Sequence, residues 1–283
     1  MALEMKIEPR AVTVGEFEIV WLPDARGTFG TYDELFTGAP AGFWQRWRAE
    51  FPELFAGNAW MVYFGAFLVR GPRAVVLIDT GLGPPPGEED FMYDRQGWLP
   101  HSLYSVGVAR DEIDIVFSTH HHSDHIGWNV HDGTPFFPRA RYVSGAEAWE
   151  WTLANRTEGF VTEQLIPLLE ADVLDLIDDG EKIAPGMMAI ATPGHYPGHM
   201  SVIVSSDDEQ AVVLADVAVH PAQISNPDVT YAFDVHPDQA SETRRGLFDR
   251  LRATNFVVLC SHYPRGGIGR LVDADGSLSW EPR

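Results

Sequence analysis

Four histidines and one aspartate lie within ten consecutive residues of this chain, in the stretch STHHHSDHIG at positions 118–127. Imidazole and carboxylate are ligands that zinc, iron, manganese and cobalt accept, whereas calcium takes oxygen ligands almost exclusively. Because successive side chains of an extended segment point to opposite sides, His120 and His122 can face one way while His121 faces the other. A metal site also needs ligands from elsewhere in the chain, so this stretch alone leaves open whether it holds one ion, two or none.

Other ligand-type side chains share one position in the sequence, because each follows a short apolar run. They are His195 shortly after MMAIAT, Asp216 at the end of AVVLAD, His262 after FVVLCS and Asp79 at the end of AVVLID. Polar side chains at the ends of apolar strands can converge at one edge of a sheet, where loops carry chemistry on a rigid scaffold.

These donors are numerous enough for two cations. One group leaves a fourth position open for water, as a catalytic zinc requires, and consists of His120, His122 and His195. The second group consists of Asp124, His125 and His262. Two adjacent cations repel each other, so a bridging carboxylate is physically sensible, and Asp216 is the residue that we expect to bridge them. Zinc is the expected metal, with manganese, iron and cobalt as alternatives.

The composition excludes several classes of protein. Hydrophobic residues make up 45% of the 283 residues and charged ones 22%, which are ordinary globular values and exclude wholesale disorder. The net charge of −21 repels phosphate backbones, so we expect no nucleic-acid partner. Cys260 is the one cysteine, which excludes an intramolecular disulfide and a CxxC metal site, and its apolar surroundings predict a buried core residue.

The termini and the apolar runs give no sign of a membrane protein. The opening residues, MALEMKIEPRAV, include acidic residues and no continuous apolar stretch, so they do not resemble a secretory signal. Apolar runs stay shorter than the roughly 18 residues that a membrane-spanning helix needs. We therefore expect a cytoplasmic protein without a membrane partner.

Short runs rich in Val, Ile and Phe, bounded by turn residues, predict strands. The predicted strands are 17–22, 60–69, 74–79, 113–119, 140–144, 187–192, 201–206, 211–216 and 256–261. Strands 60–69 and 74–79 should form a hairpin. Helices are predicted at 41–50, 145–154, 160–171 and 238–252, the last with Ala240, Leu247 and Leu251 facing a core. Strands in two clusters, each followed by helices, indicate an α/β fold with two sheets packed together and helices outside.

Five segments in order resemble the metallo-β-lactamase-fold hydrolase superfamily, in which HxHxDH is a signature. They are VVLIDTGLG (75–83), STHHHSDHIGWN (118–129), ATPGHYPGHMS (191–201), VLADVAVH (213–220) and LCSHYP (259–264). The resemblance covers most of the chain. It implies one domain over residues 1–283 with the αββα sandwich of that superfamily, two mixed sheets flanked by helices.

The presence of both His125 and Asp216 narrows the resemblance to dinuclear members such as lactonases, glyoxalase II and phosphotriesterases, and makes β-lactam hydrolysis an unexpected main role. Residues 214–264 are similar to methyl parathion hydrolase and its lactonase-like relatives. Where some homoserine lactonases have a tyrosine shortly after the bridging aspartate, this chain has Val219 or His220. That difference argues against a direct assignment to those lactonases.

The function that follows is hydrolysis of a lactone or ester by a hydroxide that bridges two divalent metals. Asp124 is the predicted catalytic residue, which orients the hydroxide and passes its proton to the leaving group. Phosphotriester cleavage is expected as a side activity, or alternatively as the main one. A mononuclear iron enzyme like the persulfide dioxygenases is a further alternative, against which the full second set of ligands argues. A non-enzymatic scaffold that binds a partner is another alternative. Such a scaffold should lack some of these ligands, and none is missing.

Several other residues carry weaker expectations. His121 should serve neither metal, His199 should make a structural hydrogen bond, and Asp79 should support the ligands from behind or fix its own turn. Four histidines are expected on the surface or in loops: His101, His131, His220 and His236. The aromatic residues Trp98 and Trp128 are candidates for the pocket wall, and Trp44 and Trp47 for core packing or a lid. A wall of this kind favours an apolar or aromatic small-molecule substrate. The sequence is compatible with a homodimer.

Overall fold

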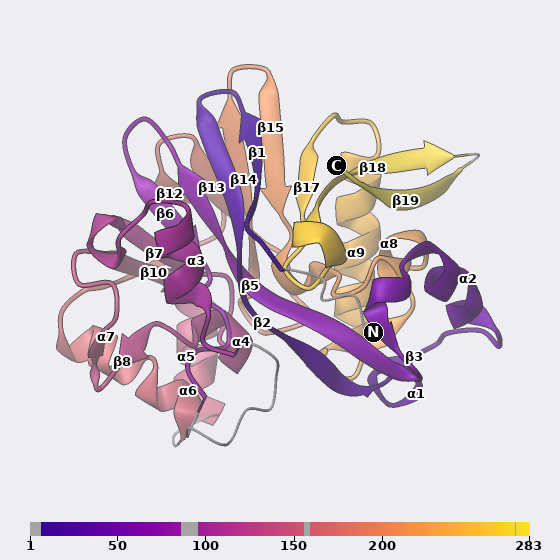
Figure 1. The fold of residues 1–283 in the computed structure, drawn as a ribbon, viewed down its shortest axis with the longest axis horizontal. Helices are drawn as coiled ribbons and strands as arrows, with labels where there is room; N and C mark the ends of the chain where they lie inside the picture. The colour runs from indigo at the N-terminus through magenta and orange to yellow at the C-terminus, as the bar shows by residue number, and fades with distance from the viewer. Residues whose placement is uncertain (1–6, 86–95, 156–158, 275) are drawn as a thin grey trace.

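The computed structural model describes residues 7–85, 96–155, 159–274 and 276–283, and it has two β-sheets packed face to face (Figure 1). In order, the first sheet contains β1 (Arg10–Val14), β2 (Phe17–Thr31), β5 (Ala59–Arg70), β6 (Val75–Ile78), β7 (Ile115–Ser118), β10 (Arg141–Gly145) and β11 (Leu174–Ile177), with β4 (Phe55–Ala56) paired to β5. The second contains β12 (Lys182–Ala184), β13 (Met187–Ala191), β14 (Met200–Ser206), β15 (Glu209–Val213), β17 (Val257–Leu259), β18 (Ile268–Ala274) and β19 (Ser277–Pro282). Both sheets mix parallel and antiparallel pairs, as the sequence predicts.

Shorter elements surround the sheets. Two small ribbons pair β3 (Phe36–Thr37) with β16 (Thr230–Tyr231) and β8 (Val130–His131) with β9 (Thr134–Pro135). The α-helices are α1 (Tyr32–Leu35), α2 (Phe43–Glu50), α3 (Leu99–Ser105), α4 (Ser123–Ile126), α5 (Ala146–Asn155), α6 (Phe160–Glu163), α7 (Ile166–Glu170), α8 (Ala222–Ser225) and α9 (Pro237–Leu251). The 3₁₀ turns are η1 (Pro52–Leu54), η2 (Arg110–Glu112), η3 (Ala215–Val217) and η4 (Pro264–Gly267).

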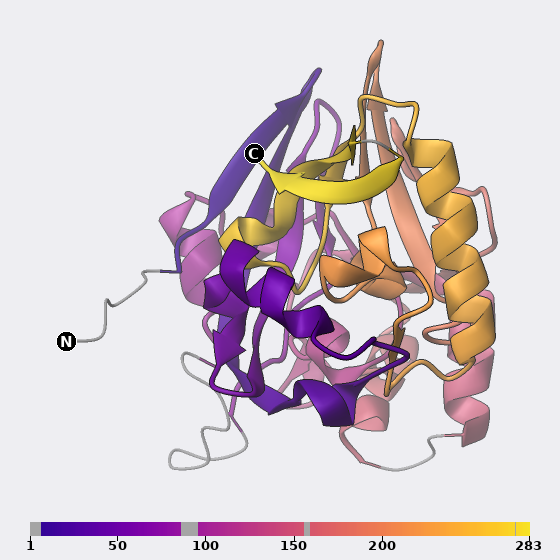
Figure 2. The same cartoon turned by 90° about the vertical axis from the view of Figure 1, so that its right-hand side faces the viewer.

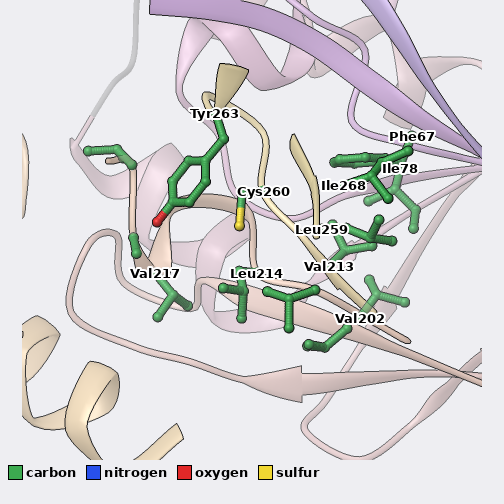
Figure 3. Packing of buried hydrophobic residues seen from close by; sticks show 14 of the residues in the cluster. Phe67, Ile78, Val202, Val213, Leu214, Val217, Leu259, Cys260, Tyr263 and Ile268 are labelled. Atoms are coloured by element: carbon green, nitrogen blue, oxygen red, sulfur yellow. The ribbon is translucent and has the colours of Figure 1, made fainter. Parts of the chain in front are cut away.

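The main core lies between the two sheets because both inner faces are apolar. Figure 3 shows Phe67 and Ile78 of the first sheet opposite Val202, Val213 and Leu259 of the second, and all five are buried. Strand alternation sends the neighbours of Phe67 to the opposite face of the first sheet. This packing fixes the two sheets relative to each other, and with them the loops at their ends.

Helices cover the outer faces. On the first sheet, Leu68 packs in one cluster with Leu103 of α3 and Leu168 of α7. On the other side of the molecule, α9 runs along the second sheet (Figure 2) and buries Leu247 and Leu251. The αββα sandwich is therefore confirmed. Among the described residues, no helix combines the length and apolar character that a membrane crossing needs.

The predicted strands are all present, and the hairpin of β5 and β6 pairs Phe67 with Ile78. The helix predicted at 160–171 is wrong, because α6 ends at Glu163 and α7 begins at Ile166. Pro167 has no N–H to donate to the carbonyl of Glu163, four residues earlier, so a continuous helix cannot pass through it. The sequence analysis also missed β1, β11, β12, β18 and β19.

Candidate metal centre

The seven ligand-type side chains predicted from the sequence meet at one end of the sandwich, in the loops that follow β7, β13, β15 and β17. Their donor atoms form two compact groups, each within 4.8 Å. The first group contains His120, His122, His195 and Asp216. The second contains Asp124, His125 and His262. This is the division that the sequence analysis expects.

Three imidazole nitrogens face one another in the first group. The Nδ1 of His122 lies 3.1 Å from the Nε2 of His120 and 3.0 Å from the Nε2 of His195. One oxygen of Asp216, Oδ2, lies 3.2 Å from the same nitrogen of His195 and 4.0 Å from that of His120. Three nitrogens and a carboxylate oxygen therefore point at a common small volume.

The second oxygen of Asp216 faces the second group. Its Oδ1 lies 3.1 Å from the Nε2 of His262 and 3.3 Å from the Nε2 of His125. Asp124 completes this group, with its Oδ2 3.5 Å from the nitrogen of His262 and 3.7 Å from that of His125. Asp216 thus lies between the two groups and presents one oxygen to each.

In three of these histidines, Nδ1, the ring nitrogen that points away from the cluster, contacts a hydrogen-bond acceptor. The Nδ1 contacts are His195 to Asp234 (3.0 Å), His125 to Asp79 (2.8 Å) and His262 to the backbone carbonyl of Tyr63 (2.8 Å). An acceptor at Nδ1 requires a proton there, so Nε2 is the nitrogen that can offer a lone pair to a metal. These three rings are therefore oriented with Nε2 toward the cluster, an arrangement usual for metal-binding histidines.

His120 is held in the same way through Thr119. The hydroxyl of Thr119 lies 2.9 Å from the Oδ2 of Asp79, to which it donates, and 3.1 Å from the Nδ1 of His120. Because the hydroxyl proton goes to Asp79, its oxygen accepts from Nδ1. The Nε2 of His120 consequently also presents a lone pair to the first group.

Two buried atoms in the centre lack the partners that buried polar atoms normally have. The Nε2 of His125 and the Oδ1 of Asp216 make no hydrogen bond with correct geometry to any described residue. Lone pairs that converge in a buried space repel one another unless a proton or cation lies between them. The donor set, five imidazoles and two carboxylates, suits divalent transition metals or zinc, so the residues present fit two such ions.

The electrostatics keep His120 neutral and Asp216 charged. Burial holds the pKa of His120 well below its ordinary value, and the neighbouring His125 lowers it further. Burial raises the pKa of Asp216, but His262, His125 and His195 outweigh this effect and hold that pKa well below its ordinary value. Burial lowers the pKa of His195, yet Asp216 and its other carboxylate partner raise it overall to about 9.

The turn that carries Asp216 is strained and is held by His199. Ala215, directly before Asp216, has a φ of 47°, a left-handed conformation that alanine rarely adopts. The backbone N–H of Asp216 donates to the Nε2 of His199 at 3.2 Å, and the Nδ1 of His199 lies 2.8 Å from the hydroxyl of Thr192. The structural role predicted for His199 is confirmed.

His121 lies outside both groups. Its two ring nitrogens are each 2.8 Å from a hydroxyl oxygen, one of Thr152 and one of Ser144, and the side chain is buried. The expectation that it faces away from its neighbours His120 and His122 agrees with these contacts. It ties the loop after β7 to α5 and β10.

His220 was expected on the surface or in a loop, and it lies in the loop between η3 and α8. Its side chain is buried, with its ring 5.2 Å from that of Trp44 and its Nε2 3.4 Å from the hydroxyl of Tyr32. Burial lowers its pKa to about 3. Trp47 is also buried beside it, so the aromatic residues of α2 form a core around His220.

The sequence analysis missed the residues that hold the ligands. They are Thr119, Asp234 and Arg244, together with the backbone carbonyl of Tyr63. Thr119 directly precedes the histidine cluster, so its position was a usable signal. The other residues come close only through the tertiary fold.

A pocket of about 690 Å³ opens above the cluster. Its floor includes His122, Asp124, Asp216 and His262. Its aromatic lining consists of Phe29, Trp60, Phe64, Phe160, Tyr231 and Phe233. Of these, Phe29, Phe160 and Phe233 are exposed at the rim, and the ring centroids of Phe29 and Phe233 lie 5.5 Å apart.

The tryptophans proposed for the pocket wall lie elsewhere. Trp128 is buried in the cluster beneath the first sheet and donates from Nε1 to Asp24 at 3.0 Å. Trp98 lines a different hollow, beside α3. Both predictions are wrong, because proximity in sequence to a metal-bearing loop does not specify on which side of that loop a side chain lies.

The match to known families agrees with this geometry. Residues 66–262 match the family model described as "Metallo-beta-lactamase superfamily". The chain belongs to the metallo-β-lactamase superfamily. The superfamily expected from the sequence is thereby confirmed, and the prediction of a metal-dependent hydrolase agrees with it.

Relatives within the superfamily include lactonases. An N-acyl homoserine lactonase of Bacillus thuringiensis is 22% identical over 211 residues, which are 69% of this chain and 79% of that protein. The "Probable metallo-hydrolase YflN" of Bacillus subtilis (strain 168) is 31% identical over 187 residues, which are 59% of this chain and 64% of that protein.

Solved structures show the same fold over nearly the whole chain. The hydrolase AbOPH of the β-lactamase superfamily superposes with a TM-score of 0.86 at 22% identity, over 99% of each chain. AidC, a dizinc quorum-quenching lactonase solved with the product N-hexanoyl-L-homoserine, gives a TM-score of 0.82 at 22% identity, over 98% of this chain and 97% of that one.

Proposed function

We propose that this metallo-β-lactamase-fold protein hydrolyses lactones with the help of two divalent metal ions, most simply zinc. One observation carries the proposal: Asp216 presents Oδ2 to three histidines and Oδ1 to a second group of donors. The proposed ligands of the first ion are His120, His122, His195 and Asp216. Those of the second are Asp124, His125, His262 and, again, Asp216.

Two such cations would lower the pKa of a water molecule between them and polarise the carbonyl of an ester. The protein supplies the rest. The acceptors behind His125, His195 and His262 hold those rings with Nε2 toward the centre, so that little reorganisation is needed when charge develops.

Asp124 is the proposed proton carrier. Its side chain is 20% exposed and lines the pocket, whereas that of Asp216 is 4% exposed. A carboxylate at the boundary between cluster and pocket can take a proton from water and deliver it to the departing alkoxide. This role leaves Asp216 to hold the two halves of the centre together.

The proposed substrate class is a small cyclic ester with an apolar substituent. The aromatic lining of the pocket suits an acyl or aryl group above a polar floor. The N-acyl homoserine lactonases among the relatives favour a lactone ring as the reacting group. Phosphotriester cleavage remains a proposed side activity, because the same centre could polarise a phosphoryl oxygen.

The test combines metal analysis with a substrate panel. Protein reloaded with zinc should contain two ions per chain and hydrolyse N-acyl homoserine lactones faster than aryl esters or phosphotriesters. Asp216→Asn should lose metal and activity, whereas Asp228→Asn, at an exposed carboxylate paired with Arg245, should retain both. Turnover of none of these substrates by the two-metal protein would refute the hydrolase proposal, and preferential cleavage of phosphotriesters would refute the lactone assignment.

The same metal analysis tests the alternative of a mononuclear iron enzyme. A protein purified without added metal should contain either two ions per chain or a mixture that zinc completes to two. A stable content of one iron per chain, unaffected by added zinc, would contradict the two-metal proposal. It would favour a mononuclear iron enzyme like the persulfide dioxygenases.

A further inference from the structure

Arg244, on α9, is a buried arginine whose five N–H groups all have an acceptor. Its side chain is 1% exposed. The acceptors are the carbonyls of Pro227 (2.9 Å from Nε) and Val217 (3.3 Å from Nη1), the Oδ2 of Asp234 (3.3 and 3.4 Å from Nη1 and Nη2) and the hydroxyl of Ser241 (3.2 Å from Nη2). Burying a guanidinium costs free energy, and a well-packed apolar residue in its place often stabilises a core equally well or better. Its contacts therefore suggest a role in fixing geometry.

One branch of these contacts leads to His195. The carboxylate of Asp234 accepts from the guanidinium with Oδ2 and from the Nδ1 of His195 with Oδ1. The backbone of His195 is also tied to the segment of Asp234, because the N–H of Val235 donates to the carbonyl of His195 at 3.0 Å. Arg244, together with the backbone N–H of Tyr231 (3.1 Å from Oδ2), thus positions Asp234, which orients His195.

The other branch leads to Asp216. Val217, whose carbonyl accepts from Nη1, directly follows Asp216 in η3. The residue before Asp216 has the left-handed φ described above, so this turn needs contacts that hold it in place. A single guanidinium therefore contacts the turn that supplies one donor, Asp216, and the carboxylate that holds a second donor of the same group, His195.

The second metal group has different supports. The ring of His125 is held by Asp79 and that of His262 by the carbonyl of Tyr63. The contacts of the guanidinium given above include neither of these supports. Through the hydrogen bonds of the described residues, the guanidinium is linked to the second group by the shared carboxylate of Asp216.

We propose that Arg244 is a positioning residue that sets the placement of His195 relative to Asp216, and thereby the affinity of the first metal group. This inference rests on the metal ligands assigned under the proposed function, though not on the substrate. It predicts an unequal effect: loss of Arg244 weakens binding at the first group much more than at the second.

The test measures two zinc dissociation constants by competition with a chelator, starting from metal-free protein. Arg244→Met should raise the constant of the first group about 10- to 100-fold, the range found when the support of a metal ligand is removed. The constant of the second group should change less than about threefold, since its own supports remain. A reference variant, His122→Ala, lacks a donor of the first group only and so identifies which constant belongs to which group.

Two further variants sharpen the result. Arg244→Lys keeps the charge, but one ammonium cannot replace a planar fork that contacts both Asp234 and Val217, so the first group should still weaken. Asp234→Asn should weaken the same group, and the double variant with Arg244→Met should be less than additive because both act on one chain of contacts. If Arg244→Met fails to fold, Arg244→Lys still decides the question, because it keeps the buried charge and removes the planar fork.

Arg245→Met is the matched control. Arg245 is the next residue on α9, 47% exposed, and its ion pair with Asp228 lies at the surface. Both zinc constants should be unchanged in this variant. A shift as large as that of Arg244→Met would mean that any arginine lost from α9 disturbs the centre, and would overturn the proposal.

The outcomes separate this proposal from the proposed function. Equal weakening of both groups, with a lower melting temperature, would show that Arg244 supports the fold in general and would overturn the proposal, as would unchanged constants. Wild-type protein that binds two zinc ions but hydrolyses no lactone would refute the proposed function, and a selective loss in Arg244→Met would still support the role of Arg244.

Discussion

The Nδ1 of His125 lies 2.8 Å from the Oδ2 of Asp79, and Asp79 reaches it from a backbone with φ of 61°. Aspartate tolerates this left-handed conformation better than most residues, though at some cost. The same carboxylate accepts from the N–H and the hydroxyl of Thr119, at 2.8 and 2.9 Å. Asp79 therefore supports the ligands from behind, one of the two roles that the sequence analysis gave it, since these side-chain bonds go to Thr119 and His125 rather than to its own turn.

Replacing Asp79 should weaken the metal centre more than it weakens the fold. Asp79→Asn keeps the shape but has one acceptor oxygen where the carboxylate has two, so either His125 or Thr119 loses its acceptor. We expect zinc affinity to fall about 10- to 100-fold, measured by chelator competition. The control is Asp114→Asn, where a carboxylate accepts from the backbone N–H of Val75 away from the centre. Equal zinc affinity in wild type and Asp79→Asn would contradict this role.

The candidate ligands could be predicted because their signals are local. Alternation along an extended segment separates His121 from its neighbours, and apolar runs indicate which polar residues end strands. The supports could not be found in this way. Arg244 lies on the same face of α9 as Ala240, Leu247 and Leu251, so the helical pattern is compatible with its burial, but that pattern does not show which distant loops the guanidinium contacts. No local pattern shows that Asp234 lies behind His195.

The fold shows the same division between local and distant signals. Apolar strands at the centre of each sheet were predicted, whereas β18 and β19 were missed. These two strands form a hairpin, and β19 is an edge strand that alternates apolar with polar residues, such as Trp280 beside Glu281. Short alternating segments give a weak signal without knowledge of the partner strand.

Removing metal should lower the thermal stability of the protein. A ligand that binds only the folded state stabilises it by about 2.7 kcal/mol when present at 100 times its dissociation constant. For a chain of this size, that corresponds to a rise in melting temperature of roughly 5–10 °C. The measurement compares chelator-treated protein with the same sample after zinc is returned. An identical melting temperature in both states would indicate that zinc does not bind the folded centre.

Asp24 should make stability depend on pH through a group remote from the metal ligands. It is fully buried and accepts from the backbone N–H groups of Leu82, Gly83 and Leu99 and from the ring of Trp128. Burial outweighs these contacts and raises its pKa from 3.8 to about 6. The folded protein therefore binds a proton more tightly than the unfolded chain, so this stabilising contribution is full below pH 3.8 and is lost as pH rises through 6.

Between pH 5 and 7 this loss should reach about 1 kcal/mol. The measurement is the free energy of unfolding of metal-free protein by denaturant at each pH. Asp24→Asn cannot ionise and should lack this part of the pH dependence, whereas Asp132→Asn, at a side chain 90% exposed, should follow the wild type. Parallel pH profiles for wild type and Asp24→Asn would contradict a raised pKa at Asp24.

Phe233 should contribute to recognition of the apolar part of a substrate. Its ring is 47% exposed at the rim of the pocket and lies beside that of Phe29, so a substituent projecting from the centre can cover both. Phe233→Ala should lower kcat/KM for lactones with long acyl chains about 5- to 30-fold, since covering part of a phenyl ring is worth roughly 1–2 kcal/mol. Lactones with the shortest chains should be hydrolysed as before, because they do not reach the rim.

Tyr104→Ala provides the control for Phe233, since Tyr104 is a large aromatic residue that is 81% exposed on α3 and does not line this pocket. Its rates should be unchanged for every chain length. An equal loss for short and long chains in Phe233→Ala would mean that the ring supports the centre itself, because a contact with the acyl chain can act only on substrates long enough to make it.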